Sequence, residues 1–260
     1  MPLRCYLQAL NTNQENTMVM KNLSHRLPFS PELEQQQETR LYWQQCQRCD
    51  TFQPIYQVSG RLLAIELLTA VVHPAAPEQN VSPEDYFEAL TIAQRLDIVQ
   101  EQLELLLQWA SFFSQRQLVA SVNIDGPTLL AIQQHAPVRA LIVLLPWVRF
   151  ELTEHHALPQ EEMVAQMPEL GPLWLDDFGS GMANFSALTE LRYDYIKLSR
   201  ELFMLLALIN RYCNGVIVEG VENEEEWQQV RNSPAMAAQG YYFSRPLPFN
   251  QLENLVLELP

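Results

Sequence analysis

Short apolar runs alternate with helical stretches along this chain, and several of the runs end on a polar or charged residue. Apolar runs bounded by turn residues predict strands, and longer stretches with one apolar face predict helices. The predicted strands cover residues 118–125, 147–154, 172–178, 193–199, 215–221 and 238–243. The predicted helices cover residues 128–135, 160–167, 185–191, 201–213 and 224–231. This alternation is typical of a (β/α) barrel with parallel strands.

The chain before residue 118 departs from this alternation. Residues 52–58 and 61–71 are apolar runs joined by Ser59 and Gly60, and a two-residue turn with glycine predicts a β-hairpin. The hairpin brings the strands to eight and makes the first strand antiparallel to the second. Ser82 as a cap, followed by Pro83, predicts a long helical region to about residue 115. We therefore expect an α/β fold, a TIM-like (β/α)8 barrel with the first strand antiparallel.

The amino-terminal part has a different character. Residues 1–30 show no sustained periodicity and are predicted to be a weakly ordered extension, with a helix over 31–49 and one domain over 31–260. Cys46 and Cys49 form an isolated C-x-x-C pair within that helix. Because a structural zinc site needs a second pair of ligands, we interpret them as ordinary thiols.

The bulk composition narrows the class of protein. A formal net charge of −15 argues against binding to DNA or RNA, which requires clustered basic residues. The apolar runs are too short to span a bilayer, and the first residues lack the apolar centre of a signal peptide. We therefore expect a cytoplasmic protein without a membrane segment. An anionic substrate remains compatible with this charge, because bound metal ions invert the local field.

The ends of the predicted strands carry the candidate chemistry. In such a barrel the carboxyl ends of the strands meet at one rim, where active sites lie. The rim would bring together Glu66, Asn123, Glu151, Asp176, Asp177, Lys197 and Glu219. Carboxylate and amide oxygens favour Mg²⁺ or Mn²⁺ over Zn²⁺. Two adjacent aspartates can serve two ions, which together clamp the attacking and leaving oxygens in phosphoester cleavage.

Simpler interpretations of these residues stay open. Asp176 and Asp177 on their own fit a solvated acidic turn. Lys197 fits either a role beside a metal-bound water or an ion pair with one of the acids. Gly179 and Gly181 would let the following loop turn tightly and approach a ligand.

Other polar residues near the rim have supporting roles in this interpretation. Glu222 is expected to support the metal ligands or to begin a helix. Glu154 is expected to fix a loop, and Gln53 and Gln239 are placed to read a base edge by hydrogen bonding. The neighbouring His155 and His156 would diverge on an extended segment, so we expect surface histidines there.

These residues, in this order, resemble the EAL-domain family of cyclic di-GMP phosphodiesterases. The matching blocks are Phe52-Gln53-Pro54-Ile55, Glu66-Leu67-Leu68, Val122-Asn123-Ile124-Asp125, Glu151-Leu152-Thr153-Glu154, Asp176-Asp177-Phe178-Gly179-Ser180-Gly181, Tyr195-Ile196-Lys197, Glu219-Gly220-Val221-Glu222 and Gln239-Gly240-Tyr241. They span residues 52–246, and their combination is highly specific. The resemblance is greatest to stand-alone enteric members of the family, which lack a sensor domain and promote motility.

The resemblance implies hydrolysis of cyclic di-GMP to linear pGpG with Mg²⁺ or Mn²⁺, which lowers the second messenger and favours motility over biofilm. It implies a first metal ion bound by Glu66, Asn123, Glu151 and Asp176, and a second bound by Asp177. It places Lys197 and Glu219 near the reacting water and Gln239 on the substrate side. Glu154 would anchor the loop after Asp177. That loop is linked to dimerisation in the family, so a homodimer is expected.

The chain departs from the family pattern at four points. Leu67 stands where alanine is usual, Ala70 where many members have a substrate-contacting arginine, and Ser199 where aspartate is usual. Only residues 201–214 connect the lysine strand to the next one. An alternative is therefore a catalytically inactive EAL protein that acts as a cyclic di-GMP receptor or protein-binding adaptor. Every matched ligand position is occupied, which favours the enzyme.

Overall fold

The computed structural model describes residues 39, 41–153, 167–178, 193–199, 206–211 and 213–259. The chain separates into two compact units, Met1–Gln45 and Cys46–Pro260. Within the first unit, residues 41–45 are helical. The second unit contains the strands and the described candidate site residues. The predicted extension over residues 1–30 lies outside the described residues.

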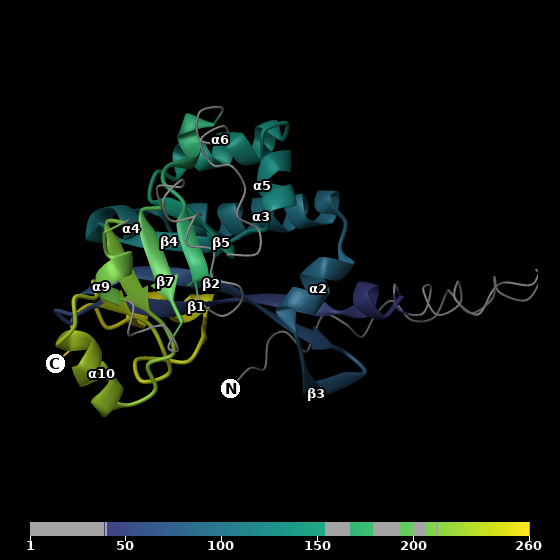
Figure 1. Cartoon of the computed structure of the whole chain (residues 1–260). Helices are drawn as coiled ribbons and strands as arrows, with labels where there is room; N and C mark the ends of the chain where they lie inside the picture. Colours follow the sequence, from purple (N-terminus) through teal and green to yellow (C-terminus); the bar gives the residue numbers. More distant parts are fainter. Residues whose placement is uncertain are drawn as a thin grey trace, which may run out of the picture. The chain divides into compact units, whose positions relative to one another are not determined.

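A closed barrel forms the centre of the second unit (Figure 1). Its strands, in order around the barrel, are β1 (Gln47–Gln57), β2 (Leu62–His73), β4 (Val119–Asn123), β5 (Val148–Thr153), β6 (Trp174–Phe178), β7 (Tyr195–Leu198), β8 (Gly215–Val218) and β9 (Ala237–Ala238). Strand β1 pairs antiparallel with both β2 and β9, and the other barrel pairings are parallel. The expected TIM-like barrel with an antiparallel first strand is confirmed.

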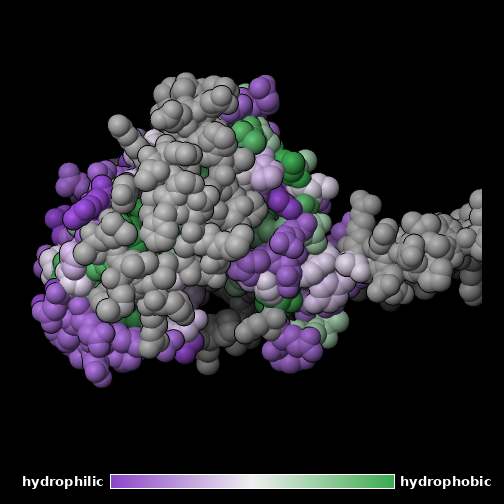
Figure 2. All heavy atoms as spheres, in the orientation of Figure 1, coloured by the Kyte–Doolittle hydropathy of each residue, from purple (hydrophilic) through white to green (hydrophobic). Residues whose placement is uncertain are grey.

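Helices lie on the outside of the strands. Those described are α2 (Pro83–Ala89), α3 (Ile92–Gln108), α4 (Ala110–Arg116), α5 (Gly126–Ile132), α6 (Ala136–Leu144), α9 (Leu206–Ile209) and α10 (Glu224–Arg231). Helix α3 packs against α5 and α6, and Figure 1 shows these three together beside β4 and β5. Helix α10 begins with three acids, and Figure 2 shows hydrophilic residues gathered there, at the lower left. Among the described helices, none has the length and apolar character needed to cross a membrane.

Two apolar clusters fill the two sides of the barrel wall. Side chains of a strand alternate between the two faces, so strands such as β2 and β6 contribute to both clusters. The inner cluster consists of Ile55, Ala64, Trp174, Ile217 and Ala237. The outer cluster joins alternate strand residues such as Leu67 and Phe150 to helix residues such as Leu103 and Ile132. The inner cluster closes the barrel interior below the polar rim and gives the rim side chains a rigid base.

Several sequence predictions needed correction within the hairpin and helical regions. The helix predicted over 31–49 ends by residue 45, because β1 begins at Gln47 and pairs with β2 along its length. Cys46 lies beside that strand and Cys49 within it, and neither forms a disulfide among the described residues. The region 82–115 forms three helices, since Thr91 makes a capping box with Gln94 and starts α3. Ser82 does cap the first of them, as predicted.

Other elements were missed or overextended. Strand β3 (Ala76–Val81) is a polar edge strand containing proline, and such a strand gives no alternating signal. Strand β10 (Leu247–Pro248) pairs with β1 over two residues. Helix α6 was missed because its apolar end resembles a strand by composition. The strand predicted over 238–243 is confined to Ala237–Ala238, because a turn follows at 241–243.

The connection between β7 and β8 does not disturb their pairing. Tyr195 to Leu198 pair in parallel register with Gly215 to Val218. The predicted helix over 201–213 is described only from residue 206, where α9 covers Leu206–Ile209. The helices predicted over 160–167 and 185–191 lie almost wholly or wholly outside the described residues. The helix predicted over 224–231 coincides with α10.

Candidate active site

Five of the rim side chains come two residues after an apolar residue of the barrel interior. Glu66 follows Ala64 in this way, and Lys197 follows Tyr195. The same step relates Asp176, Glu219 and Gln239 to Trp174, Ile217 and Ala237. Because residues two apart share one face of a strand, burial of the lower residue aims the upper one into the barrel mouth. The sequence thus sets one polar layer directly above one apolar layer.

Lys197 lies at the centre of this polar layer. Its Nζ lies 3.1 Å from Glu66 Oε2, 3.0 Å from Glu151 Oε2, 2.9 Å from Asp176 Oδ1 and 3.0 Å from Glu219 Oε1. Lys197 is 1% exposed and Glu151 is fully buried. Four carboxylates share one ammonium, so the cluster carries a formal charge of −3 when all its groups are ionised. The predicted ion-pairing role of Lys197 is therefore present in the structure.

An irregularity in β6 places the side chains of Asp176 and Asp177 on the same side of the strand. The pairing of β6 with β7 shifts between Leu175 and Phe178, and Asp177 adopts a left-handed backbone with φ of 53°. Adjacent residues of a regular strand point to opposite faces. Here Asp176, Asp177 and Glu219 each offer an oxygen within 4.8 Å of the others. A strained non-glycine conformation at a functional position costs roughly 1–3 kcal/mol and persists because the surrounding structure holds it.

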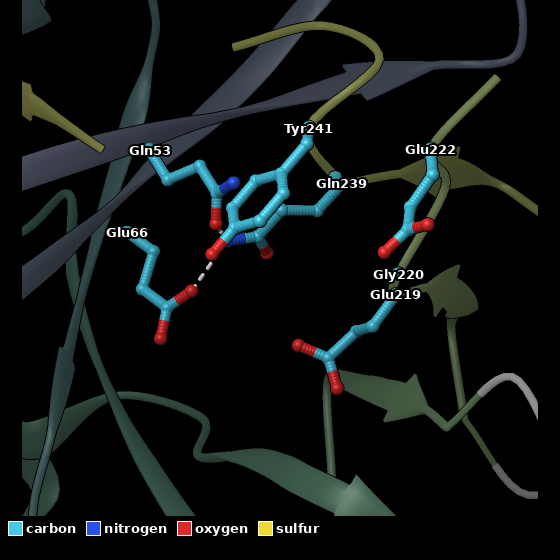
Figure 3. A pocket seen from close by; sticks show the side chains of 8 residues that line it. Gln53, Glu66, Glu219, Gly220, Glu222, Gln239 and Tyr241 are labelled. Carbon is cyan, nitrogen blue, oxygen red and sulfur yellow. Dashed lines mark hydrogen bonds between the residues drawn. The ribbon is translucent and has the colours of Figure 1, made fainter. Parts of the chain in front are cut away.

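Amide side chains hold Glu66 on both of its oxygens. Asn123 Nδ2 donates to Glu66 Oε1 at 2.8 Å, which leaves Asn123 Oδ1 as the group available for a metal ion. Gln239 Nε2 donates to Glu66 Oε2 and to Gln53 Oε1. Figure 3 shows Gln53 and Gln239 converging on Glu66, with Glu219 apart from them across the pocket.

The pocket beside these residues has a volume of about 150 Å³. It is lined by Gln53, Glu66, Glu219, Gly220, Glu222, Gln239, Gly240 and Tyr241. Glu222 is exposed and directly precedes Asn223, the residue that caps α10. Tyr241 was given no role from the sequence, and its only signal there is its place in the Gln239-Gly240-Tyr241 block. Gly240 is required, because a Cβ there would lie 2.1 Å from the main-chain oxygen of Val221.

The pKa values of the cluster diverge. Burial raises the pKa of Glu151 well above its ordinary value, and it raises the pKa of Asp176 as well, although Lys197 opposes both effects. Burial also raises the pKa of Glu219 to about 8. Burial acts on Glu66 in the same direction, but Lys197 and the donors Asn123 and Gln239 outweigh it and lower the pKa. The four carboxylates hold the pKa of Lys197 well above its ordinary value despite burial.

The donor set fits two divalent cations. Glu66, Glu151 and Asp176 offer oxygens within 4.8 Å of one another, and a second such group contains Asp176, Asp177 and Glu219. Asp176 belongs to both groups, so it could serve as a ligand for either ion. All these ligand atoms are hard oxygens, and the cluster is short of positive charge. Glu151 Oε1 is buried without a hydrogen-bond partner among the described residues, as a metal ligand would be.

Some predicted site residues cannot be placed. Glu154, His155, His156, Gly179 and Gly181 lie outside the described residues, so their predicted roles remain predictions. The remaining predicted ligands, together with Lys197 and Gln239, come together at the rim as expected from the strand ends.

A family model for the EAL domain matches residues 34–246, which is most of the chain. The chain belongs to the EAL domain family. The resemblance inferred from the strand-end motifs is thereby confirmed.

The chain is also similar in sequence or structure to individual EAL proteins. The chain is 55% identical over 236 residues to cyclic di-GMP phosphodiesterase PdeH of Escherichia coli K12, and the match covers 85% of this chain and 92% of PdeH. The crystal structure of the EAL-like domain protein YdiV superposes with a TM-score of 0.71 at 20% identity, over 82% of this chain and 98% of YdiV. Klebsiella pneumoniae BlrP1, in a complex with manganese and cyclic di-GMP, gives a TM-score of 0.58 at 24% identity, over 78% of this chain and 56% of that chain.

Proposed function

We propose that this EAL protein is a metal-dependent phosphodiesterase that hydrolyses cyclic di-GMP to linear pGpG. The observation that carries the proposal is the complete cluster of Glu66, Glu151, Asp176 and Glu219 around Lys197, with Asn123 and Asp177 beside it. The 55% identity to PdeH, a cyclic di-GMP phosphodiesterase, supports the same activity and substrate.

Glu66, Asn123, Glu151 and Asp176 would hold a first Mg²⁺ or Mn²⁺, and Asp176 and Asp177 a second. When bound, the two ions polarise the phosphodiester and lower the pKa of a coordinated water. The manganese in the BlrP1 complex supports Mn²⁺ as one suitable ion. The alternative Mg²⁺ is supported by the same oxygen-only ligands.

Lys197 and Glu219 would supply the charge and the proton acceptor that hydrolysis also requires. Lys197 Nζ lies within 3.1 Å of four carboxylate oxygens, so it would act as a fixed positive charge beside the reacting groups. Glu219 offers an oxygen within 4.8 Å of Asp176 and Asp177, so in its ionised form it would accept a proton from the attacking water. Attack at phosphorus forms one P–O bond and breaks the bond to the 3′ oxygen. The proton passes finally to that leaving oxygen, which gives the 5′-phosphorylated linear dinucleotide.

The same proposal covers the biological setting. Hydrolysis would lower the second messenger and favour motility over biofilm. The protein would act in the cytoplasm as a homodimer formed through the loop after Asp177, which Glu154 would anchor. The receptor or adaptor alternative is weaker, since no ligand position of the described cluster has been lost. Gln239 remains the proposed substrate-side amide, because its Oε1 has no hydrogen-bond partner among the described residues.

The test is conversion of cyclic di-GMP to pGpG by purified protein with Mg²⁺ or Mn²⁺, followed by chromatography, with a chelator as control. Glu66→Ala should abolish turnover, whereas Glu104→Ala, a matched change at an exposed glutamate of α3, should not. Binding of cyclic di-GMP without turnover by the wild-type protein would support the receptor instead. Turnover by Glu66→Ala at the wild-type rate would refute the site assignment.

A further inference from the structure

A chain of hydrogen bonds links the main-chain carbonyl of Ser244 to Glu66. Gln53 Nε2 donates to Ser244 O at 2.9 Å, and Gln239 Nε2 donates to Gln53 Oε1 at 2.9 Å and onward to Glu66 Oε2. Gln53 is 8% exposed, Gln239 3% and Glu66 5%, so solvent offers these groups little competition. Gln53 is paired in register with Glu66 across the hairpin, but its side chain reaches Glu66 only through Gln239.

The direction of this chain is fixed by its first acceptor. A main-chain carbonyl can only accept, so Gln53 must present its NH₂ group to Ser244 and its oxygen to Gln239. Gln239 must then present its NH₂ group to that oxygen. Both N–H bonds of this NH₂ group are used, one toward Gln53 and one toward Glu66. The carbonyl of Ser244 therefore determines that Gln239 faces Glu66 as a donor.

This donor constrains the orientation of the Glu66 carboxylate. Together with Asn123 on the other oxygen, Gln239 fixes both ends of the carboxylate while each oxygen keeps lone pairs for an ion. Partners of this kind orient a metal ligand, and their loss typically weakens metal binding by about 10–100-fold. Without Gln53, the Gln239 amide would lose the acceptor that holds it in place.

We propose that Gln53 is a positioning residue for the metal site, which acts on Glu66 through Gln239 and sets metal affinity without touching an ion. This rests on the proposed function, because it takes Glu66 as a metal ligand. Both N–H bonds of the Gln239 amide are engaged within the protein, and Gln239 Oε1 is buried without a hydrogen-bond partner among the described residues. The amides of Gln53 and Gln239 therefore serve to orient the Glu66 carboxylate.

The experiment compares Mn²⁺ binding by titration calorimetry in the wild type, Gln53→Met, Gln239→Met and the double variant. Gln53→Met should bind Mn²⁺ about 10-fold or more weakly. Gln239→Met should lose at least as much, and the double variant should lose no more than Gln239→Met, because Gln53 acts through Gln239. Gln57→Met is the matched control on the same strand and should bind Mn²⁺ as the wild type does. Among the described residues, the one hydrogen bond of the Gln57 side chain is an exposed one that it accepts from Ser59.

A second readout separates positioning from reading of the substrate. At saturating Mn²⁺, Gln53→Met should recover the wild-type KM for cyclic di-GMP, whereas loss of a base contact would leave KM raised. Additive losses in the double variant, or wild-type Mn²⁺ affinity in Gln53→Met and Gln239→Met, would overturn the proposal. If Gln53→Met does not fold, wild-type affinity in Gln239→Met alone overturns it. Failure of the wild type to bind Mn²⁺ would instead refute the proposed function.

Discussion

Replacement of Lys197 by methionine should make the stability of this protein depend on metal ions. Lys197 is buried, and four carboxylate oxygens lie between 2.9 and 3.1 Å from its Nζ. The substitution keeps most of the side-chain volume and removes the one positive charge. The formal charge of the cluster then changes from −3 to −4, since four acids lose their shared cation.

The structure sets the size of the effect. Two unit charges 3.0 Å apart, as Lys197 and Glu151 are, attract by roughly 5 kcal/mol before desolvation at an effective dielectric constant of about 20. Desolvation offsets much of this, and removal of one partner of a buried ion pair costs about 3–5 kcal/mol. One kcal/mol corresponds to about 2–4 °C in a domain of this size. We therefore expect the metal-free variant to melt roughly 6–20 °C below the wild type.

The stability lost on replacing Lys197 by methionine should increase as the pH rises. Burial raises the pKa of Glu219 from 4.5 to about 8, so the folded metal-free protein holds a proton there that the unfolded chain releases. The stability of the metal-free wild type should therefore fall as pH rises from about 4.5 toward 8. Removal of the Lys197 charge extends this fall, because that charge lowers the pKa of Glu219.

The assay is thermal unfolding of chelator-treated Lys197→Met and wild type at several pH values, with and without Mn²⁺. Added Mn²⁺ should restore much of the lost stability by supplying positive charge to the same oxygens. Catalysis should remain impaired, because an ion cannot replace the fixed ammonium in its own position. Two results would refute the account of Lys197 as the cation of the cluster. One is a metal-free variant with the same melting temperature as the metal-free wild type, and the other is a variant that Mn²⁺ does not stabilise.

Three further substitutions test other parts of the structure. Leu67 is 2% exposed in the outer core and points away from the rim, so Leu67→Ala should lower the free energy of unfolding in denaturant by about 2–5 kcal/mol. The turnover of the folded variant should be nearly unchanged, and a large loss of turnover would contradict this. Asp177→Gly should stabilise the metal-free protein by about 1 kcal/mol, by relieving the left-handed backbone, and should reduce Mn²⁺ stoichiometry in calorimetry; destabilisation would show that the position is unstrained. Gly240→Ala should lower the melting temperature strongly, because its Cβ would clash with the main chain of Val221, and an unchanged melting temperature would exclude that close approach.

The sequence predicted the barrel and the members of its rim because both depend on local periodicity. Alternation within a strand determines that Glu66 shares a face with Ala64 and that Lys197 shares one with Tyr195. Parallel strands then bring their carboxyl ends together irrespective of sequence separation. The errors fall where local signals are weak, as in polar β3 and in α6, or where a long-range pairing overrides them, as at the start of β1.

The detailed geometry of the site could not be obtained in this way. The shift in the β6–β7 pairing turns Asp177 to the same side as Asp176, and it depends on two strands held in register from outside. The hydrogen bond from Gln239 to Gln53 joins residues 186 positions apart, and its direction follows from the carbonyl of Ser244. The sequence by itself determined which groups reach the rim. Closure of the barrel decided which oxygen faces which donor, because that depends on distances between strands that no local pattern encodes.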